Sequence, residues 1–387
     1  MADFRFLTAG ESHGACLTAI VEGLPAGLKI DRDGIDRDLA RRQQGYGRGG
    51  RMKIEKDRVT VLSGIRFGET IGSPITLQIQ NKDGKNWVEK MAPFGESAGE
   101  RVTAPRPGHA DYAGIQKYNR QDIRDILERS SARETAARVA AGALAKQFLA
   151  ACGVEIVSQV VNIGGITATS RQREKMLRGD AASALNCFDP VAEEQMKERI
   201  KEAAKDGDTL GGVFEVEVRG VPVGIGSHIQ WDRRLDARLA AAFMSIQAVK
   251  GVEIGDGFRL ADLPGSMAHD ELYMDDRNRV YRRTNHAGGI EGGISNGEKI
   301  VLRAVMKPIP TLMKPLASVD IATHSPVSAV KERSDVCAVT AASVVGEAMA
   351  ALIITQAVLE KFGGDTMVDV LTALQSYKRR LTRENLQ

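Results

Sequence analysis

The sequence RSSARETAARVAAGALAKQFL, residues 129–149, decides the fold of this chain. Ser131 and Glu134 have the spacing of a capping box, in which each side chain satisfies a free backbone N–H at the start of a helix. Small apolar residues then recur at helical spacing until Gly153 ends the run. The stretch therefore predicts a narrow, buried helix whose N-terminal N–H groups and positive dipole end favour an anion.

Two arginines, Arg129 and Arg133, stand at the predicted start of this helix. A buried guanidinium group needs a negative partner, because an unpaired buried charge is strongly destabilising. The stretch can also be interpreted as an ordinary capped core helix. The paired arginines favour an anion-binding site at the helix start over that alternative.

Composition and charge limit the class of protein. The 387 residues are 43% hydrophobic and 27% charged, which is typical of a globular protein, and the net charge of +3 is too small to indicate nucleic-acid binding. Four scattered cysteines suit free thiols in a reducing compartment. The first residues lack the apolar core of a signal peptide, and polar residues interrupt the apolar run 338–359. We expect a cytoplasmic protein with no nucleic-acid or membrane partner.

The hydrophobic pattern predicts strands and helices around the central stretch. Strands are predicted at Arg5–Ala9, Cys16–Glu22 and residues 58–67, 75–80, 155–166, 213–221 and 299–307. Helices are predicted at residues 31–43, 171–179, 191–205, 235–248 and 336–362. Residues 251–265 and 267–279 are predicted to be rich in loops.

Two short loops place a histidine beside a glycine. The first, GESHG at residues 10–14, follows a predicted strand and contains Ser12 and His13. In the second, RPGHAD at residues 106–111, prolines stiffen the backbone around Arg106, and His109 follows a glycine. Each loop lets a ligand approach closely, and histidine suits proton transfer near neutral pH. The alternative for the first loop is a simple turn with a solvated histidine.

A third loop, residues 41–53, is basic and rich in glycine. Its glycines at 45, 47 and 50 match G-x-G-x-x-G. A dinucleotide-binding fingerprint follows a strand and opens a helix, whereas here a predicted helix precedes and a predicted strand follows. We interpret the segment as a mobile basic loop that closes on an anion, with a solvated flexible loop as the alternative.

Two local echoes indicate an internal duplication. The tripeptide ERS opens an Ala-rich helix at residues 128–130 and again at 332–334, and GLPAG at 23–27 resembles GVPVG at 220–224. We predict one domain, residues 1–387, duplicated roughly as 1–200 and 201–387. The two small-residue helices would lie side by side about a pseudo-twofold axis, with a sheet outside each. A chance echo of short motifs is the alternative.

The candidate polar groups indicate an enzyme that acts on a small polyanion with acid–base assistance. Planar guanidinium groups bind phosphate and carboxylate bidentately, and no residues have the spacing of metal ligands. The candidates are Ser12, His13, Arg42, Arg48, Arg106, His109, Arg133, Arg333 and Asp335. Converging arginines would repel one another without a ligand, so we expect the loops that carry them to be loose.

Four motifs together resemble the marker motifs of the chorismate synthase family, in that family's order and along essentially the whole chain. They are GESHG at 10–14, RPGHAD at 106–111, RSSARET at 129–135 and RSD at 333–335. The resemblance implies an α+β fold, a layered β-α-α-β sandwich with long Ala-rich central helices between antiparallel sheets, and a homotetramer.

The resemblance also implies an activity, that of a carbon–oxygen lyase of the shikimate pathway of aromatic amino acid biosynthesis. The reaction is the anti-1,4-elimination of phosphate from 5-enolpyruvylshikimate 3-phosphate to give chorismate. It requires reduced FMN without net redox change, so the cofactor supplies the difficult chemistry. The source of reduced flavin is open: this chain would use NADPH itself or depend on a separate reductase.

Individual roles follow from the resemblance. His13, with Ser12 beside it, would protonate the departing phosphate, while His109 would donate a proton to the reduced flavin and Asp335 would help deprotonate it. Contacts to FMN are implied for Ser130, Ser131, Ala132, Gln247, Ala248, Gly292, Lys307, Pro308, Ile309, Pro310, Thr311 and Arg333. Substrate contacts are implied for Arg106, Arg133, Arg42 and Arg48, of which the last two suit NADP equally.

Three rival classes fit the sequence less well. A nucleic-acid binder would need aromatic residues among the basic ones, but only Tyr46 lies in the basic loop. A serine hydrolase would need the G-x-S-x-G elbow, which the residues around Ser12 do not match. An NAD(P)-dependent oxidoreductase is disfavoured by the misplaced glycines.

Overall fold

The computed structural model describes residues 4–50, 54–96, 99–169, 183–276, 279–332 and 334–384. Its helices are α1 (Arg32–Gln43), α3 (Asp111–Tyr118), α4 (Arg124–Ser130), α5 (Thr135–Ala151), α7 (Pro190–Lys205), α8 (Leu235–Met244), α9 (Gly265–Ala268), α10 (Val339–Phe362) and α11 (Met367–Glu384). Short 3-10 helices are η1 (Asp83–Asn86), η2 (Ala132–Glu134), η3 (Trp231–Arg233) and η4 (Gly257–Asp262).

The strands are mostly short, and four pairs of them form isolated hairpins. They are β1 (Arg5–Ala9), β2 (Cys16–Glu22), β3 (Val59–Val61), β4 (Ile65–Arg66), β5 (Glu69–Thr70), β6 (Ile75–Gln80), β7 (Glu155–Ile163), β8 (Ile166–Thr167), β9 (Gly212–Arg219), β10 (Val249–Ile254), β11 (Leu272–Met274), β12 (Val280–Arg282), β13 (Ile290–Glu291), β14 (Ile294–Ser295), β15 (Ile300–Met306), β16 (Ala317–Val319) and β17 (Pro326–Ser328).

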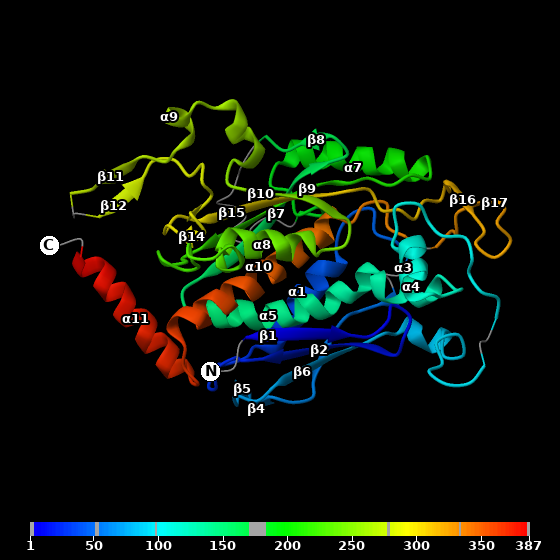
Figure 1. Ribbon diagram of the computed structural model, residues 1–387, viewed down its shortest axis with the longest axis horizontal. Helices are drawn as coiled ribbons and strands as arrows, with labels where there is room; N and C mark the ends of the chain where they lie inside the picture. The colour runs from blue at the N-terminus through cyan, green and yellow to red at the C-terminus, as the bar shows by residue number, and fades with distance from the viewer. Residues whose placement is uncertain are drawn as a thin grey trace.

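The first sheet covers one side of the central helices. Its antiparallel strands run in the order β1-β2-β6-β3. Along β2, Leu17, Ala19 and Val21 are buried, whereas Ile20 lies on the opposite face and is exposed. This alternation is typical of an antiparallel strand with one covered face, as the sequence predicts. In Figure 1 the sheet lies beside α5.

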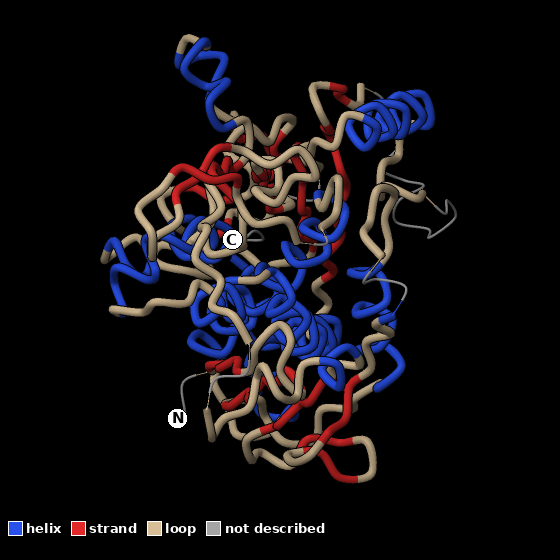
Figure 2. The backbone as a smooth tube through the Cα atoms, turned by 90° about the vertical axis from the view of Figure 1, so that its right-hand side faces the viewer, coloured by secondary structure: helices blue, strands red, loops and turns tan. Residues whose placement is uncertain are grey.

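The second sheet, also antiparallel, has the order β10-β15-β9-β7-β8. Without β8, its order from β7 is β7-β9-β15-β10, which corresponds to β1-β2-β6-β3 in the first sheet. In chain order, α1 follows β2 and α8 follows β9, and one long helix, α5 or α10, follows each set of strands. Figure 2 shows the two groups of strands on opposite sides of the central helices.

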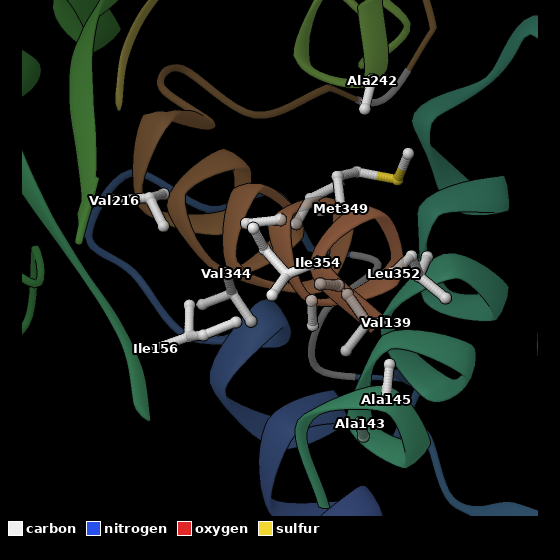
Figure 3. Close-up of a cluster of buried hydrophobic side chains, with 14 of the residues drawn as sticks. Val139, Ala143, Ala145, Ile156, Val216, Ala242, Val344, Met349, Leu352 and Ile354 are labelled. Carbon is white, nitrogen blue, oxygen red and sulfur yellow. The ribbon is translucent and has the colours of Figure 1, made fainter. Parts of the chain in front are cut away.

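The helices α5 and α10 pack against each other through small side chains. A Cβ built on Gly142 would lie 2.4 Å from the Cβ of Ala348, which is too close for two carbons. Figure 3 shows Val139 of α5 near Leu352 and Val344 of α10 in the surrounding core. By length and composition α10 could span a membrane, but 89% of its most apolar window is buried inside the molecule, as the sequence predicts for a core helix.

The start of α5 differs from the predicted capping box. The Ser131 hydroxyl accepts from the backbone N–H of Arg133 at 3.3 Å, but the Ser131 N–H donates to the carbonyl of Leu127 at 3.0 Å. The Glu134 carboxylate accepts from the Thr8 hydroxyl at 2.7 Å instead of reaching back to Ser131. The Ser131 half of the capping box is confirmed, because its hydroxyl accepts a backbone N–H. The Glu134 half was wrong, because α4 and η2 lead almost directly into α5 and its first turn is not an isolated helix start.

Several other elements have different bounds from those predicted. Glycine turns split two predicted strands into β3 and β4 and into β7 and β8. The edge strand β10 lies where a loop was predicted, because a register shift between Val249 and Gly251 hides its alternation. The mostly polar helix α11 was not predicted at all. The predicted helix at 171–179 lies outside the described residues.

Candidate active site

His13 lies in the loop between β1 and β2 and is held by a buried carboxylate of α4. Its Nδ1 lies 2.9 and 3.1 Å from the two side-chain oxygens of Glu128, and its backbone N–H donates to the same carboxylate at 2.7 Å. The N–H of Ser12 donates to the Glu128 carbonyl at 2.9 Å. A carboxylate only accepts, so Nδ1 carries the proton in this pair, and Nε2 is the nitrogen that can exchange a proton with a ligand.

A closed ring of contacts fixes the His13 imidazole. The ring lies 4.2 Å from that of Trp87, and the Arg124 guanidinium lies 4.8 Å from the same indole while pairing with Glu128 at 3.0 Å. Burial alone would favour neutral Glu128, but His13 and Arg124 outweigh it and lower the pKa of this carboxyl group. The carboxylate therefore stays ionised at neutral pH and holds the imidazole by a charge-assisted hydrogen bond.

Arg42 and Arg133 meet at one buried carboxylate. Arg42, near the end of α1, lies 3.1 Å from Asp57, and Arg133 of η2 lies 2.7 Å from the same oxygen. Arg133 also donates at 2.9 Å to the side chain of Asn81, whose amide donates to two carbonyl groups of the loop that carries His13. The His13 loop and the start of the central helix are therefore joined into one unit.

This arginine pair retains donors for an anion. Burial lowers the pKa of Arg42 to about 10; Asp57 opposes this shift, and the charges of Arg133 and Arg48 add to it. Arg42 is still protonated at neutral pH. Nε of Arg42 and Nη2 of Arg133 are buried without a hydrogen-bond partner in the described part of the chain. Because such groups are costly to bury unsatisfied, a bound anion would be favoured here.

The glycine loop after α1 reaches the segment before α10. Arg48 lies 2.8 Å from one oxygen of Asp335, and the N–H of Gly49 donates to the other oxygen at 2.6 Å. A Cβ on Gly49 would lie 2.8 Å from the Ser334 carbonyl, so a larger residue would not fit this approach. Arg333 lies outside the described residues, and its role stays a prediction.

Arg106 and His109 form a second group just before α3. Asp111 accepts from Nε and Nη2 of Arg106 at 2.8 and 3.1 Å and from Nδ1 of His109 at 2.5 Å. Burial opposes ionisation, but His109 and Arg106 hold the pKa of Asp111 well below its ordinary value. Arg106 also donates to the Thr311 hydroxyl at 3.0 Å, which ties this group to the segment after β15.

The segment 307–311, which carries predicted flavin contacts, lies against the His109 loop. The Lys307 ammonium donates to the carbonyl of Gly108, and Pro310 lies 3.5 Å from where a Gly108 Cβ would stand. The Lys307 N–H donates at 2.9 Å to the carbonyl of Ala248, whose φ of +66° is unusual for a residue with a side chain. Residues 108, 248 and 307–311 are thus brought together.

The other predicted flavin contacts are more dispersed. Gln247 donates to Glu134 at 3.2 Å, while its Oε1 is buried with no hydrogen-bond partner among the described residues. Ser130 donates to the Ile126 carbonyl at 2.8 Å, and Ala132 is exposed. Gly292, with φ +59°, lies between β13 and β14, a hairpin that Figure 1 shows far along the central helices from α3 and α4.

The two histidine groups lie on adjoining elements, because α3 and α4 contact each other. Two cavities of the described chain are not lined by either histidine: one of about 400 Å³ lies beside Arg41 and Lys146, and one of about 390 Å³ lies beside Arg129 and Gln247, a predicted flavin contact. The polar groups, not these cavities, define the candidate site. No group of three or more His, Cys, Asp or Glu in the described ranges is arranged to hold a metal ion.

Sequence reasoning missed most of the groups that hold the histidines and arginines of the site in place. Glu128, Asp57 and Trp87 were not predicted, and Asp111 was quoted only as part of a motif. The arginines therefore do not simply repel one another, as their number suggested, since the four described ones each have a carboxylate. The capping-box spacing indicated Glu134. The only signal for Glu128 was its position directly before the RSSARET motif.

Comparison with known proteins shows the family of this chain. Residues 4–359 match the model of the family described as chorismate synthase. The chain is 59% identical to the chorismate synthase of Geobacter sulfurreducens and 58% identical to that of Geobacter metallireducens, in each case over 96% of this chain and 98% of the relative. A crystal structure of chorismate synthase superposes with a TM-score of 0.80 at 44% identity and covers 99% of both chains. This chain belongs to the chorismate synthase family.

Proposed function

We propose that this chain catalyses the anti-1,4-elimination of phosphate from 5-enolpyruvylshikimate 3-phosphate to give chorismate. The observation that carries the proposal is a histidine held by an ionised, buried carboxylate next to a pair of arginines with unused donors. Glu128 directs Nε2 of His13 as the proton-exchanging atom. Protonation of a departing phosphate needs such an acid within reach of an anion site.

The substrate's phosphate and carboxylates are matched by arginines whose acidic partners leave donors available. A guanidinium group has five N–H donors, and a single carboxylate occupies at most two or three of them. Arg42, Arg48, Arg106 and Arg133 can therefore keep their carboxylates and still bind the substrate. Asp57 holds Arg42 and Arg133 together, with Arg48 close enough for its charge to act on Arg42, before the substrate arrives, which lowers the cost of binding it.

The residues fit a flavin mononucleotide. The unsatisfied Oε1 of Gln247 suits a hydroxyl or N–H donor, and the space beside Gly292, where an added Cβ meets nothing within 4 Å, leaves room for a ring or chain. Ser130, Ser131, Ala132 and residues 307–311 would add backbone and hydroxyl contacts. Reduced FMN, when bound, supplies the electron chemistry that weakens the bond to phosphate.

His109 and Asp335 are assigned the proton chemistry around the flavin. Asp111 orients the His109 ring through Nδ1, while Nε2 lies 3.3 Å from Nη2 of Arg106 and would exchange its proton beside that guanidinium group. Asp335 is shared by Arg48 and the Gly49 N–H. Its proposed role is that of a proton acceptor of the site.

The fold is proposed to be a layered β-α-α-β sandwich with an internal pseudo-twofold repeat in one domain. The matching strand orders and the equivalent places of α1 and α8 support this. On these matches the second unit would begin at β7, near residue 155, rather than near residue 200. The insertion that carries α7 explains why the sequence echoes suggested the later boundary.

The chain is proposed to be a cytoplasmic homotetramer. Large apolar side chains are exposed on the outer strands and hairpins: Leu7 is 65% and Leu272 63% exposed, and Leu7 is paired in register with the exposed Ile20. Exposed apolar pairs of this kind mark protein contacts. All four cysteines are free thiols, which suits a reducing compartment. Light scattering after gel filtration measures the assembly directly.

The decisive experiment is an anaerobic assay with 5-enolpyruvylshikimate 3-phosphate, followed by the appearance of chorismate and phosphate. We expect turnover with FMN reduced by dithionite and none with oxidised FMN. Turnover with NADPH plus FMN would assign flavin reduction, and a nicotinamide site at Arg42 and Arg48, to this chain. No chorismate with chemically reduced FMN would refute the proposed function.

A further inference from the structure

A buried carboxylate on α10 lies outside the groups assigned so far. Glu347 has 1% of its side chain exposed and accepts hydrogen bonds from three elements. Arg41 of α1 donates to both of its oxygens at 2.6 and 2.8 Å, Lys146 of α5 donates at 2.8 Å, and Ser158 of β7 donates at 2.6 Å. A single carboxylate thus joins both central helices, α1 and the second sheet.

The cluster around Glu347 is electrically balanced. Asp38 accepts from Arg41 at 3.0 Å and from Lys146 at 2.9 Å, so two cations face two anions. Burial favours neutral Glu347, but Lys146 and Arg41 outweigh it and keep its pKa below the ordinary value. Such a cluster adds little net stability over apolar residues, because desolvation offsets much of the attraction. Its geometry, rather than its energy, needs an explanation.

The next residue along α1 belongs to the active site. Arg41 and Arg42 point to different partners: Arg41 to Glu347, and Arg42 to Asp57 beside Arg133. Six residues further on, Arg48 reaches Asp335 just before α10. The end of α1 and the glycine loop are therefore attached to the α10 segment at two points, and the loop between them contains flexible glycines at 45 and 47.

We propose that Glu347 is a positioning residue, which fixes α1 against α10 through Arg41 and thereby aims Arg42 and Arg48 at the anionic groups of the substrate. The inference rests on the proposed function only for the identity of that substrate. A helix rotates or slides as a unit, so loss of the bidentate contact at Arg41 moves the neighbouring Arg42 with it. Displacement of a binding group by about 1 Å is enough to cost up to about a hundredfold.

The test separates positioning from stability with a charge-balanced variant. Glu347→Gln alone leaves Lys146 and Arg41 undercompensated and is expected to unfold easily. Lys146→Met with Glu347→Gln removes one charge of each sign, so the cluster stays neutral and the melting temperature stays near that of the wild type. Ser158→Ala is the control, because it removes a donor to Glu347 without touching α1.

Two readouts are followed in all variants. We expect the double variant to raise KM for 5-enolpyruvylshikimate 3-phosphate by about tenfold to about a hundredfold, with a smaller change in kcat. Without substrate or flavin, trypsin should cleave it faster after Arg48, while Ser158→Ala keeps wild-type values of both.

The outcomes are distinguishable. An inactive wild type would refute the proposed function. The rate of trypsin cleavage after Arg48 would still test whether Glu347 fixes α1 against α10. A folded double variant with wild-type KM and wild-type cleavage after Arg48 would overturn the inference. An equal rise of KM in Ser158→Ala would also overturn it, because the effect would then not pass through α1.

Discussion

At the scale of single residues, the site is built from cations and imidazoles that are each held by an acid, which is distant in the chain except for Asp111, two residues from His109. Glu128 lies 115 residues from His13, and Asp57 lies 76 residues from Arg133. The histidines and arginines were predictable because short glycine and proline motifs surround them. The distant acids were not predictable, because nothing local in the sequence links residues so far apart, whereas Asp111 lies within the RPGHAD motif itself.

Glu128→Gln is expected to lower turnover without unfolding the protein. The amide still fills the space but no longer holds the His13 imidazole by a charge-assisted bond, so the loss should lie between about tenfold and the full general-acid contribution of about 10²–10⁴. Steady-state kinetics with chemically reduced FMN measure it. The matched control is Asp125→Asn, at an exposed position of the same helix where the carboxylate pairs with Arg120 at 2.6 Å.

The two histidines themselves are expected to be essential. His13→Ala and His109→Ala should each lower turnover by about 10²–10⁴ while the melting temperature changes little, because both lie in loops at the edge of the core. The exposed His269 gives the control variant His269→Ala. Near-normal turnover in either loop variant would remove the role assigned to that histidine.

At the scale of elements, the contact of α5 with α10 sets how close the two central helices lie. Gly142→Ala is expected to destabilise the protein by about 1–3 kcal/mol, because the new methyl overlaps Ala348 in a well-packed core. Urea unfolding measures the change. Alanine is otherwise the better helix former, so a loss of stability would indicate the overlap with Ala348.

The control for this prediction is another helical glycine. At Gly34 of α1, an added Cβ meets only the ends of the Asp31, Arg37 and Gln147 side chains at 3.0 Å or more. These ends are flexible, so Gly34→Ala should be neutral or stabilising. Equal urea midpoints for Gly142→Ala and the wild type would mean that the helices can separate at no cost.

The glycine loop after α1 is expected to respond to ligands. Arg48 pairs with Asp335, and substrate or NADP bound beside it would add a further anchor. Trypsin should therefore cleave after Arg48 more slowly when the substrate and FMN are both present. Limited proteolysis followed by mass spectrometry tests this, with cleavage in the exposed helix α7 as the internal control; identical rates would contradict it.

At the scale of the whole molecule, paired carboxylates make the protein sensitive to acid. Arginine, lysine or histidine partners lower the pKa of Asp57, Asp111, Glu128, Glu134 and Glu347 against the opposing effect of burial. A carboxyl group with a lowered pKa stabilises the folded state above its unfolded pKa, here 3.8 for Asp and 4.5 for Glu. That stability is lost as the pH falls through the folded value.

The urea midpoint is therefore expected to be constant between pH 7 and 6 and to fall steeply below about pH 4.5, because the unfolded chain then binds more protons than the folded one. Circular dichroism at several pH values measures it. The double variant Lys146→Met with Glu347→Gln lacks one of these groups and should show a shallower fall. A midpoint that does not change down to pH 3 would contradict the pairing of these acids.

The sequence by itself determined the local features: two small-residue helices, the alternating strands β1, β2 and β6, and the loops that carry His13, His109 and the arginines. Each depends on residues a few positions apart, so spacing reveals it. Only the tertiary structure decided how α4 and η2 lead into α5, where the strand β10 lies, which distant acids hold the site and how α1 is attached to α10. These depend on contacts between distant segments and on the burial of charge, which a linear pattern does not contain.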